Sequence, residues 1–201
     1  DLGYLNMYEK TSMVVDYIST IKSLADGIQV GQFFDFSTLK RLATNNENLD
    51  SLVFISQQSF NRIDTYLRET NRSSLSSVIV AGVWIEGLYL STRVAQDVYN
   101  EKINETIGEQ KVIISTLLLL LNNYKADPNI KALIADLEEI KVLYDQVKIT
   151  IEVGETVPIE KDGVLTFQQN DVQTIHMSDE LLKQIVAKVQ NVRNRIIKGA
   201  N

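Results

Sequence analysis

Cysteine is absent from this chain of 201 residues, and histidine occurs once, at His176. The absence of cysteine excludes disulfide bonds, thiolate nucleophiles and cysteine-ligated zinc, although it does not identify the cellular compartment. A single histidine cannot supply a two-histidine zinc site or the paired Glu-x-x-His motifs of a di-iron bundle within one chain. We therefore expect no metal site and no cofactor, and we interpret His176 as a polar residue at the edge of a flap.

Motifs for phosphate, nucleotide and acyl chemistry are also missing. The chain contains no G-x-x-x-x-G-K-[ST], G-x-G-x-x-G, G-x-S-x-G or D-x-D-x-D-G pattern. Its 20 basic residues are outnumbered by 26 acidic ones, which gives a net charge of -6, and the basic residues form no dense run. Because nucleic-acid surfaces need clustered Lys and Arg, we expect no nucleic-acid partner.

Long apolar runs and prolines are scarce. The most apolar run, 112–121, contains Ser115 and Thr116 and is far shorter than the roughly 20 residues that span a bilayer. We therefore expect a core helix there and no transmembrane span. With only 2 prolines in the chain, long uninterrupted helices are permitted.

Sustained helical periodicity is what the sequence does contain. Apolar residues recur at steps of three and four, which places them along one face of a helix. Asp127 before Pro128, and Ser178 before Asp179, are typical helix starts. The pattern predicts an all-α fold, a helical bundle of about six to seven helices. The expected helices cover 2–26, a short segment that starts at Asp35 or Ser37, 50–70, 73–100, 102–124, 130–151 and 178–199.

A different pattern interrupts the helices between Glu152 and Met177. Apolar segments at 157–160 and 164–167 flank Asp162-Gly163, a pair typical of tight hairpin turns. We expect one small β-hairpin near 157–167. The chain should form a single helical domain over 1–201. Its expected parts are a main bundle at 1–150, a linker and hairpin flap at 151–177, and a C-terminal helix at 178–199 that packs on the bundle.

The segment 73–100 is apolar around nearly its whole circumference, which predicts a buried central helix with Trp84, Ile85 and Leu88 inaccessible. An unpaired carboxylate at Glu86 would be costly there. The spacing places Arg93 two turns from Glu86 on the same stripe.

Trp84, Glu86, Tyr89 and Arg93 are therefore the candidate binding residues. We predict a buried or half-buried ion pair between Glu86 and Arg93, backed by Asp97. Its role is to fix helix register, or to anchor a ligand if a pocket opens beside it. We interpret Trp84 as a core residue in preference to a stacking platform. No catalytic residue is assigned.

Four segments carry a resemblance to known proteins. These are DLGYLNMYEKT at 1–11, AGVWIEGLYLSTRVA at 81–95, DGVLTF at 162–167 and VRNRIIKG at 192–199. The chain resembles a group of exported helical proteins of Bacteroidetes, many of them lipoproteins, that have no assigned function. The resemblance implies a periplasmic or outer-membrane-associated protein whose signal peptide has been removed, with a lipid anchor upstream of residue 1 as a further expectation. It transfers no functional residue.

Three function classes follow. The favoured one is a non-enzymatic exported helical protein that binds a partner protein or a small ligand at the bacterial cell envelope. The alternative is an enzyme that uses Glu86, Arg93 and Tyr89 in a bundle pocket. A structural spacer or scaffold is the third. An open pocket beside Glu86 would favour the enzyme, whereas a sealed helix interface would favour a structural role for these residues.

Overall fold

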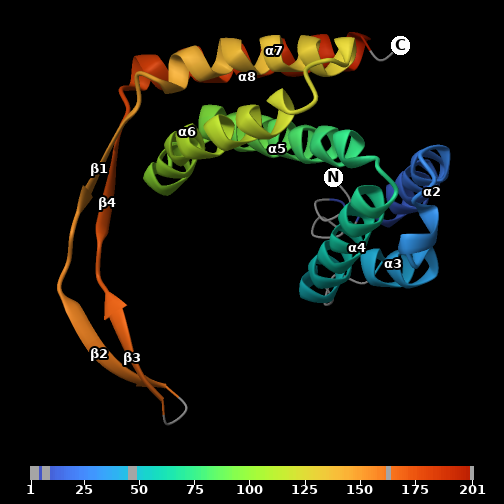
Figure 1. Cartoon of the computed structure of the whole chain (residues 1–201), viewed down its shortest axis with the longest axis horizontal. Helices are drawn as coiled ribbons and strands as arrows, with labels where there is room; N and C mark the ends of the chain where they lie inside the picture. The colour runs from blue at the N-terminus through green and yellow to red at the C-terminus, as the bar shows by residue number, and fades with distance from the viewer. Residues whose placement is uncertain (1–4, 6–9, 45–48, 162–163, 200–201) are drawn as a thin grey trace. The chain divides into compact units, whose positions relative to one another are not determined.

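The structure is a computed structural model that describes residue 5 and residues 10–44, 49–161 and 164–199 (Figure 1). Across these residues it is all-α with seven α-helices and a small β region, so the predicted fold class is confirmed. We expected one domain over 1–201 with a main bundle at 1–150. Contacts within the chain group into two compact units, residues 1–76 and residues 77–201, and the single domain stays a prediction.

The described residues of the first unit form three long helical segments that pack on one another. They are α2 (Thr11–Gly27), α3 (Phe36–Ala43) and α4 (Leu49–Glu69), with the 3-10 turn η1 (Gly31–Phe33) after α2. Val14, Ile18, Leu39 and Leu52 form part of their buried core. Of the segment 2–10 at the start of the first predicted helix, only Leu5, which is helical, and Lys10 lie within the described residues.

Asp35 caps helix α3, as its position in the sequence predicts. Its carboxylate accepts hydrogen bonds from the Ser37 hydroxyl at 2.6 Å and from the Thr38 backbone N–H at 3.0 Å. These bonds, that of Ser37 first, hold the pKa of Asp35 well below its ordinary value. Because the charged carboxylate satisfies free amides of the first turn, Asp35 fixes where α3 begins.

The second unit is built on four helices. They are α5 (Ser73–Asp97), which starts at the end of the first unit, α6 (Glu101–Asn122), α7 (Pro128–Tyr144) and α8 (Asp179–Gly199). The predicted caps are confirmed: Asp127 accepts a hydrogen bond from Asn129 N–H at 2.8 Å, and Ser178 accepts one from Leu181 N–H at 3.2 Å. Helix α7 packs against both α6 and α8, so it is the element that joins them.

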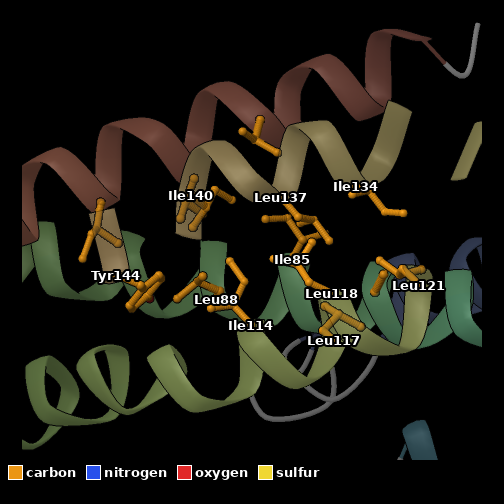
Figure 2. Packing of buried hydrophobic residues seen from close by; sticks show 14 of the residues in the cluster. Ile85, Leu88, Ile114, Leu117, Leu118, Leu121, Ile134, Leu137, Ile140 and Tyr144 are labelled. Atoms are coloured by element: carbon orange, nitrogen blue, oxygen red, sulfur yellow. The ribbon is translucent and has the colours of Figure 1, made fainter. Parts of the chain in front are cut away.

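Buried aliphatic side chains from all four helices form the core of this unit (Figure 2). Ile85 of α5, Ile114 of α6 and Leu137 of α7 are almost fully excluded from solvent. Tyr144, at the end of α7, is also fully buried, and its hydroxyl donates a hydrogen bond to the Ile107 carbonyl at 3.0 Å. Burial raises the pKa of Tyr144 well above its ordinary value, so the phenol stays protonated and remains a donor.

The predicted helix at 130–151 is too long. Helix α7 ends at Tyr144, and strand β1 (Lys148–Glu152) begins four residues later. Val147 is buried, as its place in the apolar repeat predicts, but it lies in the connection. The following Ile149-Thr150-Ile151 is β-branched throughout, which favours an extended backbone over a helix.

Strand β1 starts a two-stranded ribbon that runs from 148 to 176 (Figure 1). It pairs with β4 (Val172–His176), and β2 (Thr156–Lys161) pairs with β3 (Val164–Gln169). The predicted hairpin near 157–167 is therefore confirmed but is only the distal half of a longer ribbon. The Asp162-Gly163 turn lies outside the described residues. At His176 an imidazole nitrogen lies 3.0 Å from the Thr150 hydroxyl across the ribbon.

The base of the ribbon rests on α6. Strand β4 packs on this helix, and Gly108 faces Ile175 so closely that any side chain at 108 would overlap it. Further out, Gly154 lies against the Asn170 backbone and donates its N–H to the Asp171 carboxylate at 3.0 Å. A glycine is thus required at both points, because each is a close approach of backbone to a neighbouring residue.

Helix α5 is less buried than predicted. Ile85 and Leu88 are buried as expected, but Val83 and Leu90 on the opposite face are exposed. The expectation of a buried Trp84 is wrong: its indole is half-buried and donates to Gln110 Oε1 at 2.9 Å. By length and composition α5 is also the one helix of the described residues that could cross a membrane, a test that core helices pass too, and 33% of its apolar window is buried.

We predict that Tyr144→Phe lowers the free energy of unfolding by about 1 kcal/mol, since it removes one buried hydrogen bond and little volume. Tyr144→Ala should cost about 3 to 5 kcal/mol, because it also leaves a cavity. Urea denaturation monitored by circular dichroism measures both. Equal losses for the two variants would show that the ring is not packed in the core.

Candidate functional site

Glu86, the central residue of the predicted site, forms an ion pair with Arg193 of α8. Arg193 Nε lies 2.9 Å from Glu86 Oε2, and Arg193 Nη2 lies 2.9 Å from Glu86 Oε1, so the pair is bidentate. The Arg193 guanidinium also lies over the Tyr89 ring, 4.4 Å from its centroid. We call Glu86, Tyr89 and Arg193 the Glu86 cluster.

The predicted ion pair between Glu86 and Arg93 is wrong. Arg93 is exposed and donates to Gln96 Oε1 at 3.1 Å, and Asp97 is exposed at the end of α5. Seven residues of helix separate the Cα atoms of Glu86 and Arg93 by about 10 Å along the axis. Arg193 reaches Glu86 directly because its helix packs beside α5. The signal in the sequence that could have identified Arg193 is its position next to the buried Val192, on the apolar face of α8.

The electrostatics of the Glu86 cluster favour a structural role. The hydrogen bond to Glu86 raises the pKa of Arg193, so the guanidinium stays charged and cannot exchange protons near neutral pH. The carboxylate is occupied by two N–H donors, and both side chains are partly buried, with 34% of Glu86 and 26% of Arg193 exposed. The cluster therefore joins α8 to α5, and both oxygens of its carboxylate are already occupied by Arg193.

The four predicted site residues do not gather at one place. Glu86 and Tyr89 meet through Arg193, Trp84 turns to Gln110 of α6, and Arg93 stands apart on the surface. Sequence spacing placed all four on one helix correctly, but their contacts depend on the neighbouring helices.

A shallow surface pocket of about 150 Å³ lies elsewhere in the second unit, and none of the predicted residues line it. Glu101 and Asp179 stand in the first turns of α6 and α8, where a carboxylate also stabilises the helix dipole. The Asn104 side-chain oxygen is buried without a hydrogen-bond partner. Among the described residues no group of three or more Asp, Glu or His is arranged to hold a metal ion. The lining residues are Tyr99, Glu101, Asn104, Glu105, Ile175, Met177 and Asp179.

Helices α7 and α8 are joined by a second set of charges. Glu139 accepts from Lys188 at 3.0 Å and from Arg195 at 2.8 Å, and Arg195 also contacts Asp136 at 2.6 Å. The Lys188 hydrogen bond, reinforced by Arg195, lowers the pKa of Glu139 below its ordinary value. These contacts hold together the two helices from which the ribbon leaves.

The ribbon carries a group of large exposed apolar side chains. Phe167 is 71% exposed and Leu165 is 65% exposed on β3, and Val153, Ile151 and Val172 are exposed nearer the base. Sequence analysis predicted the hairpin but assigned it no role. Its alternating apolar residues without a helix to cover them were the available signal.

Searches of protein-family models, curated proteins and solved structures find no match to this chain. The resemblance to exported helical proteins of Bacteroidetes therefore stays a prediction.

We predict a coupling free energy of about 1 kcal/mol between Glu86 and Arg193. The cycle combines Glu86→Gln and Arg193→Met and is measured by urea denaturation. Glu86→Gln combined with Arg93→Met is the matched control and should couple near zero. A stronger coupling to Arg93 than to Arg193 would contradict the geometry.

Glu139 should make the free energy of unfolding depend on pH in the acidic range. Its folded pKa lies below the unfolded value of about 4.3, so its contribution is complete above that pH and is lost as pH falls through the folded pKa. Glu139→Gln should therefore flatten the decline of unfolding free energy below about pH 4.5. Glu138→Gln, at the exposed neighbouring position, is the control. If unfolding free energy declines equally with falling pH in both variants, Glu139 does not contribute to the acid dependence.

Proposed function

We propose that this chain is a non-enzymatic interaction protein of the bacterial cell envelope whose distal ribbon, strands β2 and β3, binds a partner protein. The observation that carries the proposal is the exposure of Phe167 and Leu165 on a ribbon that leaves the helices. Large exposed apolar side chains grouped on one element are typical of interaction surfaces.

The stability of the ribbon supports this function. An isolated two-stranded hairpin is at best marginally stable in water, and further strands or a packed surface are needed for independent stability. The base has such a surface, because β4 packs on α6. For β2 and β3 a bound partner would supply it.

The helices support the same function by holding the ribbon in place. Strand β1 follows α7 and β4 precedes α8, so the ribbon leaves from two helices that are joined by Glu139, Lys188 and Arg195. A ribbon anchored at both ends of its base presents its distal strands with little loss of conformational freedom on binding.

The enzyme alternative has less support. It required Glu86, Arg93 and Tyr89 in a pocket, but Glu86 is occupied by Arg193 and Arg93 lies elsewhere. The small-ligand alternative would use the surface pocket. Among its described residues, the one buried side-chain oxygen without a hydrogen-bond partner, Asn104 Oδ1, is shielded from solvent, so a ligand could not reach it without a side-chain movement. Placement at the envelope is supported by the resemblance of four sequence segments alone.

Site-specific photocrosslinking in the native host tests this proposal. A benzophenone side chain at Phe167 should give a discrete crosslinked complex. The same group at Lys131, an exposed position of α7, is the control and should give none. Equal crosslinking at both positions, or none at Phe167, would refute a partner site on the ribbon.

A further inference from the structure

The hydrogen-bond pattern of the distal ribbon follows from its register. Asn170 N–H donates to the Glu155 carbonyl at 3.3 Å, so these two facing residues form a hydrogen-bonded pair. In an antiparallel pair such positions alternate with non-hydrogen-bonded ones. The facing pairs Thr156 with Gln169 and Pro158 with Phe167 are therefore non-hydrogen-bonded, as is Glu160 with Leu165.

This alternation decides which backbone groups face outward. The N–H and C=O of a residue in a non-hydrogen-bonded pair point away from the paired strand. On β3 the residues whose backbone groups face outward, here called outward residues, are Leu165, Phe167 and Gln169. On β2 they are Thr156, Pro158 and Glu160, and Pro158 has no N–H to donate. The β2 edge is thus blocked at its centre, as edge strands often are, whereas the β3 edge has a complete set of donors and acceptors.

Strand β3 also lacks the charges that protect exposed edges. Its sequence, VLTFQQ, has no charged residue, in a chain that is 23% charged. Lysine, inward charges and proline are the usual means of preventing edge-to-edge pairing. An open, uncharged edge with exposed Phe167 and Leu165 is suited to pairing with another strand.

We propose that two copies of this chain associate through their β3 edges, in antiparallel orientation, with Phe167 opposite the partner's Phe167. This rests on the proposed function and names the partner as a second copy. The pairing aligns three outward residues on each side: Phe167 with the partner's Phe167, and Leu165 with the partner's Gln169 in both directions. About six N–H···O bonds result, two for each facing pair.

Self-complementarity is the reason to name a second copy. The register pairs every outward donor of β3 with an outward acceptor of the same strand, as a two-fold axis requires. It brings no like charges together, because β3 has none. It also joins two marginal ribbons into a four-stranded sheet, which exceeds the three strands that a β-sheet with an apolar face needs for independent stability. Phe167, Pro158 and Leu165 of both copies then lie on one face.

The absence of native cysteine makes disulfide trapping a clean test. Facing Cα atoms in a hydrogen-bonded antiparallel pair lie about 5.5 Å apart, within disulfide range. Phe167→Cys should therefore give a covalent dimer under mild oxidation. Thr156→Cys, on the same face but at the blocked edge, is the matched control. A mixture of Leu165→Cys and Gln169→Cys should crosslink far more than either variant alone, which tests the register without removing the phenyl ring.

Sedimentation and hydrogen exchange test the association in the unmodified chain. We expect a monomer–dimer equilibrium, and Phe167→Lys should weaken it about tenfold or more by placing like charges opposite each other, whereas Thr156→Lys should not. The amides of Leu165, Phe167 and Gln169 should become protected as concentration rises, while those of Thr156 and Glu160 stay unprotected.

A chain that remains monomeric, or a dimer that Phe167→Lys leaves intact, would overturn the proposal. The mass of the complex crosslinked through Phe167 in the host separates the two claims. Twice the chain mass supports both. A different mass retains the ribbon as a partner site and refutes self-pairing. No crosslink refutes both.

Discussion

The burial of α7 between α6 and α8 is the constraint on which the second unit depends. Leu137, Ile140 and Tyr144 are fully excluded from solvent, and the Tyr144 hydroxyl is satisfied by the Ile107 carbonyl. Because this bond is made at the last residue of α7, it fixes where that helix stops against α6. The chain then has only a short connection before β1, so the position of the ribbon follows from the position of Tyr144.

The ribbon shows what this arrangement makes possible. Its base is covered by α6, where Gly108 admits Ile175, whereas its distal strands present apolar side chains to solvent. A free ribbon of this kind adds little to the stability of its own chain. We propose that it serves an interaction, and the contrast between the blocked β2 edge and the open β3 edge indicates that the partner binds along β3.

Much of the fold could be predicted from local sequence. Helix α4 and the caps at Asp35, Asp127 and Ser178 follow from periodicity and from the need to satisfy free amides, which are properties of neighbouring residues. The hairpin followed from turn chemistry. The end of α7 was missed because Val147 and Ile151 also fit a helical repeat, and only the β-branched Ile149-Thr150-Ile151 argued otherwise.

The candidate site was predicted less well, because its contacts join distant segments. Glu86 was correctly singled out as a carboxylate that needs a partner, but Arg193 lies 107 residues further along the chain. Intrahelical spacing could offer only Arg93. Similarly, an apolar circumference predicted a fully buried α5, although a helix of that composition can leave one apolar face exposed, as Val83 and Leu90 do.

We expect the helices of the second unit to fold without the distal ribbon, which we propose serves association. Deleting 155–170 tests this, because Gly154 then joins Asp171 and a three-residue loop closes β1 onto β4. Trp84, the only tryptophan, reports unfolding of this unit by fluorescence. In urea titrations at low protein concentration, the unfolding free energy of the shortened chain should match that of the full chain to within about 0.5 kcal/mol. A loss of several kcal/mol would show instead that the distal ribbon is part of the fold of this unit.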